Sequence, residues 1–435
     1  MTRKIRFIHA ADIHLGAPVR GLCDVSPEWA SALQEATANA WERVVSAAIA
    51  NEVDFIIIAG DMFDSARPSY GDYMRLFDGL EKLHEAHIPS FLVTGNHDPF
   101  TSWERDVSRL PKSATLLGVN KPQFALFSRD DEPLCLLGGR SYYNQAWPSD
   151  ESMASGITRT AAMEALMPEH PNAGDAPFAI GVIHAGLEPD QSKARVELSE
   201  LLDADVDYWA CGHLHERHVF LNEVSPCVVY PGCVQGQTID EGGECGCFLV
   251  EMEEGMPSGA GSARVNLEFI PTSSIVLQKV TVDVSACQTL ADVRRHVQSE
   301  LFHEMGKNHC DDMIVQITLV GDTELHEFLA KSLIMRDLRH QINNAHPNFY
   351  CDLLRNKTRL PQGDQRDRES DELFIEIVET IAEEQRLRED VIVNFIQSEF
   401  VKRGVTVPSL LSDCMGERID EAERLVLDLL RGDSE

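Results

Sequence analysis

Five short motifs in the first half of the chain carry side chains that can bind metal ions. Each motif directly follows an apolar run that is typical of a buried strand. In chain order the motifs are Asp12-Ile13-His14, Gly60-Asp61-Met62-Phe63-Asp64, Gly95-Asn96-His97-Asp98, His184 and Gly212-His213-Leu214-His215. Because ligands collect at the carboxyl ends of strands in open α/β sheets, the sequence predicts that these motifs form one site.

The donor atoms of these motifs are oxygens and imidazole nitrogens, without a thiolate. The seven candidate metal ligands are Asp12, His14, Asp61, Asn96, His184, His213 and His215. This mixture suits Mn, Fe, Zn or Mg better than a soft metal. Seven ligands are too many for one tetrahedral ion, but they suit two ions ~3.5–4 Å apart that share a carboxylate. Such a pair polarises a phosphoryl oxygen and lowers the pKa of a bridging water, so the pattern favours phosphoester hydrolysis.

Simpler interpretations exist for single motifs and for the remaining histidines. Any one motif alone is better explained as a turn at a strand end, because Asp and Asn favour turns. Five such motifs, each after an apolar strand, favour the dinuclear centre instead. We interpret His9 as a core or neighbouring residue, His84 and His87 as solvated helix residues, and His218 as a residue near the site that is not a ligand.

The elements that position the motifs alternate between strand and helix. Strands are predicted over residues 5–11, 54–59, 90–94, 134–138, 178–184, 208–211, 227–230, 247–252 and 265–270. Helices are predicted over residues 27–50 and 69–87. A second, smaller set comprises strands at 275–284, 313–320 and 349–353 and helices at 290–304 and 324–333, before amphipathic helices at 371–386, 388–403 and 419–431. This order indicates an α/β layered domain followed by a small α+β domain and a helical tail.

The motif order DxH, GDxxD, GNHD, H and GHxH resembles the calcineurin-like metallophosphoesterase superfamily over residues 4–270. The resemblance implies an α/β four-layer sandwich, in which helices flank two mixed β-sheets. It implies that one ion is held by Asp12, His14 and His215. It implies that the other ion is held by Asn96, His184 and His213, with Asp61 bridging the two. His97 matches the histidine that orients the phosphate and protonates the leaving group, and Asp64 matches the acid that hydrogen-bonds this histidine.

Residues 12–18, 60–69 and 94–98 resemble the SbcD-like bacterial DNA repair exonucleases, especially their YhaO-like relatives. Superfamily protein phosphatases carry Arg and Glu where this chain has Ser65 and Asp98, and some archaeal and eukaryotic nucleases carry His in place of Asp64. The resemblance implies a DNA exonuclease or endonuclease subunit with Mn²⁺ as its first expected metal. It also implies DNA and a coiled-coil ATPase related to structural-maintenance-of-chromosomes proteins as partners, with a homodimer left open. Two alternatives remain: a small-molecule or nucleotide phosphodiesterase, and a metal-bound regulatory subunit of such an ATPase.

Three domains are predicted: a metallophosphoesterase domain at 1–272, a capping domain at 273–365 and a helical partner-binding region at 366–435. Residues 331–368 form a basic island, with eight Lys and Arg against four Asp. The candidate DNA contacts are Arg20, Arg67, Arg336, Arg339, Arg355, Lys357 and Arg359. For each of them, a solvated face or a surface salt bridge is the alternative explanation.

The whole chain is strongly acidic, with a formal net charge of −33 over 435 residues. Such a charge repels phosphate over most of the surface, so we expect DNA affinity to be local, weak and reinforced by a partner. The 11 cysteines include no CxxC pair, which indicates thiols in a reducing compartment. The sequence has no secretory signal and no apolar run of membrane-spanning length, so the expected location is the cytoplasm.

Overall fold

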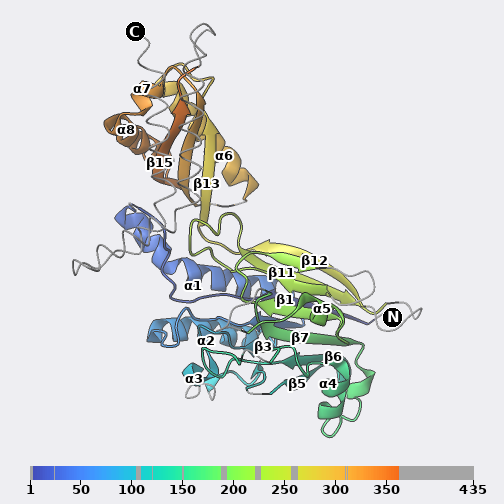
Figure 1. Cartoon of the computed structure of the whole chain (residues 1–435). Helices are drawn as coiled ribbons and strands as arrows, with labels where there is room; N and C mark the ends of the chain where they lie inside the picture. The colour runs from blue at the N-terminus through green and yellow to red at the C-terminus, as the bar shows by residue number, and fades with distance from the viewer. Residues whose placement is uncertain are drawn as a thin grey trace, which may run out of the picture. The chain divides into compact units, whose positions relative to one another are not determined.

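The computed structural model describes residues 3–23, 25–103, 109–119, 121–148, 151–187, 194–220, 227–255, 263–308, 310 and 312–361 (Figure 1). The chain divides into two compact units. The larger unit comprises Met1–Val280, Ser299–Ile317 and Ile342–Leu353, and the smaller one comprises Thr281–Gln298, Thr318–Gln341 and the chain from Leu354 onward. The helices predicted over residues 371–431 lie outside the described residues, and the domain boundaries at 272 and 365 stay predictions.

The first sheet of the larger unit has six strands in the order β12-β11-β1-β2-β3-β4. Their bounds are β1 (Lys4–Ala10), β2 (Phe55–Ala59), β3 (Ser90–Val93), β4 (Ala114–Leu116), β11 (Gly246–Glu253) and β12 (Arg264–Pro271). Strands β1 to β4 are parallel, whereas β11 runs antiparallel to β1 and to β12. The carboxyl ends of β1, β2 and β3 therefore lie at one edge of this sheet.

The second sheet has six strands in the order β5-β6-β7-β8-β10-β9. Their bounds are β5 (Gln123–Arg129), β6 (Glu132–Gly139), β7 (Phe178–His184), β8 (Tyr208–Gly212), β9 (His218–Phe220) and β10 (Cys227–Tyr230). Strands β6, β7, β8 and β10 are parallel, and β5 and β9 run antiparallel to their neighbours. Both sheets are thus mixed, as predicted.

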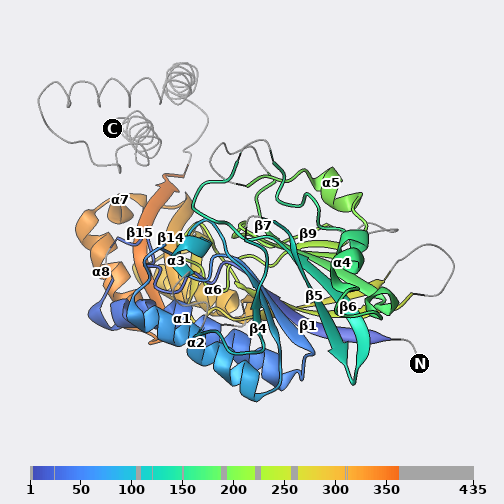
Figure 2. The same ribbon diagram turned by 90° about the horizontal axis from the view of Figure 1, so that it is seen from below.

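Apolar residues on alternate positions of the strands build the four layers. Ile56 and Ile58 on β2 pack with Trp41 in the core beneath the helices. Phe55 and Ile57 point to the other face and pack against the second sheet. The outer face of the second sheet packs against α4 (Arg159–Leu166) and α5 (Leu198–Leu202). The expected sandwich of two mixed sheets flanked by helices is confirmed (Figure 2).

Two long helices cover the outer face of the first sheet. Helix α1 (Pro27–Ala50) has the predicted bounds, and its start is fixed by the Ser26 side chain, which accepts from the Trp29 N–H at 3.4 Å. Helix α2 (Tyr70–Glu85) begins with a capping box between Ser69 and Asp72. These caps satisfy main-chain donors that a helix start otherwise leaves without partners. None of the described helices is long and apolar enough to cross a membrane.

A third, three-stranded sheet follows in the order β13-β14-β15, and each of its strands has residues in both units. The elements of this region are β13 (Val276–Asp283), α6 (Leu290–Lys307), β14 (Met313–Asp322), α7 (His326–Leu329), α8 (Ser332–Asn343) and β15 (Phe349–Arg359). The prediction of one helix over 324–333 is wrong. Buried His326, whose Nδ1 lies 3.0 Å from Thr358 Oγ1, fixes a short α7, and buried Leu338 and Ile342 extend a separate α8.

Candidate metal centre

The five motifs meet where the carboxyl ends of β1, β2 and β3 face those of β7 and β8. Main-chain hydrogen bonds join the first two loops, since the His14 N–H donates to Asp61 O at 3.0 Å. Two further bonds join the sheets. His184 Nδ1 lies 2.9 Å from Ala59 O, and the His213 N–H donates to the Asp12 carboxylate at 2.9 Å. The loops are therefore held in one cluster by the packing of the two sheets.

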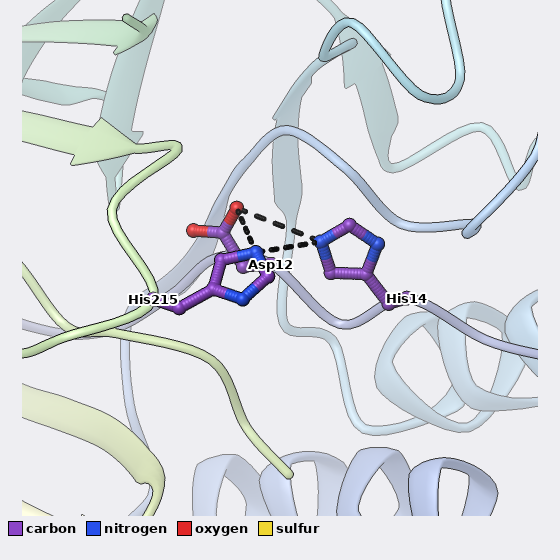
Figure 3. A group of neighbouring side chains, drawn as sticks. All are labelled: Asp12, His14 and His215. Carbon is purple, nitrogen blue, oxygen red and sulfur yellow. Dashed lines mark hydrogen bonds and ion pairs between the residues drawn. The ribbon is translucent and has the colours of Figure 1, made fainter. Parts of the chain in front are cut away.

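One group of donors consists of Asp12, His14 and His215, which converge from the two sheets (Figure 3). The Nε2 atoms of His14 and His215 are 3.2 Å apart. Asp12 Oδ1 lies 3.9 Å from His14 Nε2 and 4.0 Å from His215 Nε2. This is the trio that the family resemblance assigns to one ion, and its three donor atoms surround a common point.

Asp61 lies between this trio and a second group of donors. Its Oδ2 atom is 3.2 Å from His184 Nε2 and 3.7 Å from His14 Nε2. Asn96 Oδ1 is buried and has no hydrogen-bond partner among the described residues. His184 Nε2 is also buried, and it faces the Asp61 carboxylate in an ion-pair contact without a well-formed hydrogen bond. The His213 ring packs edge-to-face on His184, with the ring centres 5.3 Å apart. Buried polar atoms without partners need an explanation, and bound cations at this position would provide one.

Four candidate ligands have a main-chain conformation that is unfavourable for residues with a side chain. The φ angles are +50° at Asp12, +48° at His14, +50° at Asp61 and +99° at His213. Each such residue costs about 1–3 kcal/mol and persists only where its surroundings fix it. The hydrogen bonds between the loops hold these residues in place. The unfavourable conformations lower the stability of the fold, and they place the four side chains in the cluster.

Glycines in the motifs permit the close approach of the loops. A Cβ atom at Gly95 would lie 2.0 Å from Asp61 Oδ1. At Gly60, where φ is +88°, a Cβ atom would lie 2.4 Å from His184 Nδ1. Any side chain at these positions would displace the carboxylate or the imidazole beside it.

Two family models match the sequence. Residues 5–217 match the calcineurin-like phosphoesterase family, and residues 278–359 match the middle domain of the metallophosphoesterase YhaO. Residues 5–217 form a calcineurin-like phosphoesterase domain. Proteins of this family use a dinuclear metal site, and the clustered His and Asp side chains of this chain fit metal binding.

Several proteins are similar to this phosphoesterase. The uncharacterized metallophosphoesterase YhaO of Bacillus subtilis is 28% identical over 323 residues, which is 73% of each chain. The DNA double-strand break repair protein Mre11 of Sulfurisphaera tokodaii is 24% identical over 79% of each chain. Mre11 of Methanosarcina mazei is 34% identical over 22% of this chain and 15% of its own. A solved dimetal phosphatase from Danio rerio covers 62% of this chain and 99% of its own, at 13% identity and a TM-score of 0.34.

His97 is partly exposed to solvent. Its side chain is 42% exposed, against 29% for His215 and almost complete burial for His14 and His184. His97 Nδ1 lies 3.0 Å from the main-chain oxygen of Asp64. The Asp64 carboxylate is 3.9 Å from the same nitrogen and 3.5 Å from His14 Nδ1. The expected hydrogen bond from His97 to the Asp64 carboxylate is therefore replaced by one from His97 Nδ1 to the Asp64 carbonyl.

Two acidic residues that support the site were missed as functional residues. Glu241 Oε1 lies 2.8 Å from His215 Nδ1, and its Oε2 accepts from the Gln237 N–H at 2.6 Å. Asp98 is fully buried and accepts from the N–H groups of Met62 and Gly95 at 3.0 and 2.9 Å, which ties two motif loops together. Asp98 ends the GNHD motif and could have been found there, but no motif marks Glu241.

The charges of the site are coupled across the two sheets. Burial lowers the pKa of His184, but the neighbouring Asp61 carboxylate outweighs burial and raises it to about 9. Burial also lowers the pKa of His215, and the Glu241 hydrogen bond and Asp12 raise it to about 9. Burial raises the pKa of Asp61, yet His184 and His14 bring it below the usual value. The protein thus holds carboxylates beside protonated imidazoles, and bound metal ions would replace those protons.

The predicted DNA contacts lie in both units. On the larger unit, Arg20 is 69% exposed with its guanidinium 3.9 Å from Asp64, and Arg67 is exposed. The smaller unit carries the other five predicted contacts, on α8 and on alternate positions of β15: Arg336, Arg339, Arg355, Lys357 and Arg359. Alternate positions of a strand lie on one face, so β15 carries a basic stripe.

The structure confirms some, but not all, of the predictions made for the other histidines. His9 is fully buried, with Nδ1 2.9 Å from the Tyr208 hydroxyl, as expected for a core residue. His87 is exposed, as predicted. His84 is half-buried against Ser113 Oγ at 2.9 Å, so its prediction as a solvated residue is wrong. His218 is partly exposed on β9, and its Nε2 lies 3.8 Å from Glu216.

Proposed function

We propose that this phosphoesterase is a metal-dependent phosphodiesterase, and more specifically a DNA exonuclease or endonuclease subunit that acts in DNA repair. The observation that carries the proposal is the meeting of carboxylates and imidazoles from two sheets around Asp61, with His97 beside them and open to solvent. The clustered donors can bind ions, while the partly exposed His97 imidazole can reach a substrate. That combination suits hydrolysis better than a purely structural metal site.

The seven candidate ligands fit two divalent ions by donor type, and two overlapping groups of them, Asp12 with His14 and His215 and Asp12 with Asp61 and His184, have donor atoms close enough to share an ion. One ion would be held by Asp12, His14 and His215. The other would be held by Asn96, His184 and His213, with Asp61 shared between them. Mn²⁺ is our first choice, with Fe, Zn and Mg as alternatives. When bound, such ions polarise the phosphoryl group and supply hydroxide at neutral pH.

His97 is the proposed proton donor to the departing oxygen. The Asp64 carbonyl can only accept a hydrogen bond, so His97 carries its proton on Nδ1 in the neutral form. Nε2 is then the nitrogen available to the substrate, and the protonated ring can donate from it. The main-chain N–H of His97 also donates to Asp61 Oδ1 at 2.9 Å, which fixes the loop against the metal-binding carboxylate. A histidine held in this way can orient a phosphate and assist its leaving group.

DNA as substrate is supported by sequence similarity and by local charge. Relatives along much of the chain include a DNA double-strand break repair protein, 24% identical over 79% of both chains. The basic stripe on β15 and the exposed Arg20 and Arg67 offer cationic groups for phosphates. Because phosphate contacts release counterions, DNA binding should weaken steeply as salt rises. DNA affinity that does not change with salt would contradict the role of these residues.

A nucleotide or small-molecule phosphodiester is the second candidate substrate. The observation that favours it is the net charge of −33, which repels a long polyanion from most of the surface.

A coiled-coil ATPase that binds residues 366–435 would lend DNA affinity to an acidic nuclease. Truncation after residue 387 should then abolish ATPase binding and keep hydrolysis of simple substrates. Retained ATPase binding by the truncated chain would contradict this part of the proposal.

One experiment separates these candidates. The purified full chain is incubated with Mn²⁺ and, in parallel, with linear duplex DNA, single-stranded DNA, cyclic nucleotides, bis-p-nitrophenyl phosphate and phosphomonoesters, each with and without EDTA. We expect EDTA-sensitive cleavage of DNA and of the aryl diester. His97→Ala should abolish both, and the exposed His87→Ala is the matched control. Cleavage of cyclic nucleotides alone would support the second candidate, and unaltered activity in His97→Ala would refute the proposed role of His97.

A further inference from the structure

Two cysteine thiols lie at the ends of the loop that carries Glu241. The Sγ atoms of Cys233 and Cys245 are 3.6 Å apart, and the two residues are twelve positions apart in the sequence. Cys233 is completely buried, whereas Cys245 is partly accessible, and both are free thiols. Two sulfur atoms in contact across a short loop are well placed to be joined.

The main chain on both sides of this pair is already fixed. The Cys233 N–H donates to His215 O and the Gly246 N–H donates to Cys233 O, each at 3.1 Å. The Thr272 N–H donates to Cys245 O at 2.9 Å. A disulfide bond is about 2.05 Å long, so the sulfur atoms must approach by about 1.5 Å. Rotation of the two side chains can supply most of this movement.

The loop between the two cysteines orients a candidate metal ligand. Glu241 holds His215 Nδ1 at 2.8 Å, and its other oxygen accepts from the N–H groups of Gln237 and Thr238 at 2.6 and 3.3 Å. The Arg20 N–H donates to Gln237 O at 2.7 Å, which ties the loop to the chain after β1. A change in the mobility of this loop therefore changes how firmly Glu241 holds the His215 ring.

We propose that Cys233 and Cys245 form a reversible disulfide that closes this loop and holds Glu241 against His215. The oxidant is a peroxide. It oxidises the accessible Cys245 thiol to a sulfenic acid and leaves as an alcohol, or as water from hydrogen peroxide. The Cys233 sulfur then displaces the sulfenic oxygen, which leaves as water, and the S–S bond forms. Two thiols are oxidised by two electrons in total, and an external dithiol reverses the reaction by exchange.

The surroundings assign different roles to the two sulfurs. Cys233 is completely buried and therefore out of reach of solvent, whereas Cys245 is partly accessible. Cys245 is the sulfur that meets the oxidant, and Cys233 acts only after the sulfenic acid has formed beside it.

The bond itself is tested by thiol counting and peptide mapping. The full chain, purified under reducing conditions, is treated with hydrogen peroxide, and its thiols are titrated after denaturation. Of the 11 cysteines, two should be lost, and a disulfide between the peptides that hold Cys233 and Cys245 should appear and vanish with dithiothreitol. Cys245→Ser and Cys233→Ser should each abolish this product, while Cys287→Ser, which removes a partly exposed thiol elsewhere, should not. Full thiol counts after peroxide, or a different cysteine pair, would overturn the proposal.

The effect on the loop is tested separately by hydrogen exchange. Amides of residues 234–244 should exchange at least several-fold more slowly in the oxidised chain, and this slowing should be absent in Cys245→Ser. Equal rates of amide hydrogen exchange in both redox states would refute the proposal that the disulfide holds the loop in place. A third measurement rests on the proposed metal centre: Mn²⁺ release to EDTA should be slower in the oxidised chain. If the chain binds no Mn²⁺, the proposed function fails while the disulfide and exchange results still decide this inference.

Discussion

The two sheets of the phosphoesterase domain contribute different chemistry to the candidate metal centre. Every oxygen ligand, namely Asp12, Asp61 and Asn96, follows a strand of the first sheet. The second sheet contributes only imidazoles, from the ends of β7 and β8. The anionic half of the site and most of its neutral ligands therefore come from different layers of the sandwich.

This difference means that the site is complete only when the sheets are packed. Two polar contacts join the halves: Asp61 Oδ2 lies 3.2 Å from His184 Nε2, and the His213 N–H donates to the Asp12 carboxylate at 2.9 Å. Neither half contains the whole ligand set of either proposed ion, because Asp12 and His14 need His215 and Asn96 needs His184 and His213. We expect substitutions in the oxygen half to cost more activity than changes in the groups that support the imidazole half.

The largest effect is expected from Asp61→Asn, because Asp61 lies against imidazoles from both sheets. Loss of the shared carboxylate should lower kcat for bis-p-nitrophenyl phosphate by at least about 10³-fold, since metal catalysis supplies several kcal/mol. The control is Asp54→Asn, which removes a partly buried carboxylate at the opposite end of β2, where Asp54 accepts from the Arg6 N–H. Equal losses in both variants would mean that Asp61 acts only through stability.

Gly95→Ala tests the same carboxylate through its packing. The new Cβ atom would lie 2.0 Å from Asp61 Oδ1, so the carboxylate or the loop must move. A displacement of about 1 Å at a catalytic group costs about 10²-fold in rate. Gly306→Ala on α6 is the control, because a Cβ atom there meets nothing within 4 Å. Normal kcat for Gly95→Ala would show that Asp61 need not occupy its observed position.

A smaller effect is expected in the imidazole half from Glu241→Gln. Removing the charge that holds His215 Nδ1 should weaken Mn²⁺ binding by about 10- to 100-fold, the usual range for residues that orient a metal-binding histidine. Calorimetric titration with Mn²⁺ measures this directly. Asp240→Asn, which changes an exposed neighbour paired with Lys279, should bind Mn²⁺ normally. Wild-type affinity in Glu241→Gln would place Glu241 outside the metal-binding machinery.

The smallest effect concerns a contact between the sheets that involves no metal. Burial of His9 against Tyr208 lowers its pKa from 6.5 to about 3. Below pH 6.5 the unfolded chain binds a proton at His9 that the folded protein does not, so stability falls as pH falls toward 3. The slope is at most about 1.4 kcal/mol per pH unit. His9→Phe should reduce the slope of urea-unfolding free energy between pH 6.5 and 5, and an unchanged slope would contradict this assignment.

The gathering of the candidate ligands in one place could be predicted from the sequence, because donor type and strand ends are visible in residue order. Strands such as β7 and β10 are continuous apolar runs, buried on both faces, and were predicted with the observed bounds. The short or partly exposed strands β4, β5 and β9 lack such runs and were not predicted. β15 was predicted only as far as residue 353, but it continues to Arg359. In its second half, charged residues alternate with buried Leu354 and Thr358, and this pattern is a weaker signal of a strand than an apolar run.

The supporting residues could not be read from residue type alone. Glu241 reaches His215 from 26 positions away through a loop without regular structure. The contact between Asp64 and His97 uses the main-chain oxygen of Asp64, which every residue has, so residue type alone could not predict it. Such contacts follow from the path of the loops, which local sequence patterns do not specify.

The central claim is that ligands from two sheets hold two metal ions around Asp61. A crystal of the full chain soaked in Mn²⁺ and measured at the manganese absorption edge tests it most directly. We predict two anomalous peaks, one beside Asp12, His14 and His215 and the other beside Asn96, His184 and His213, with the Asp61 carboxylate touching both. A single peak, or peaks away from Asp61, in a fully soaked crystal would contradict the account.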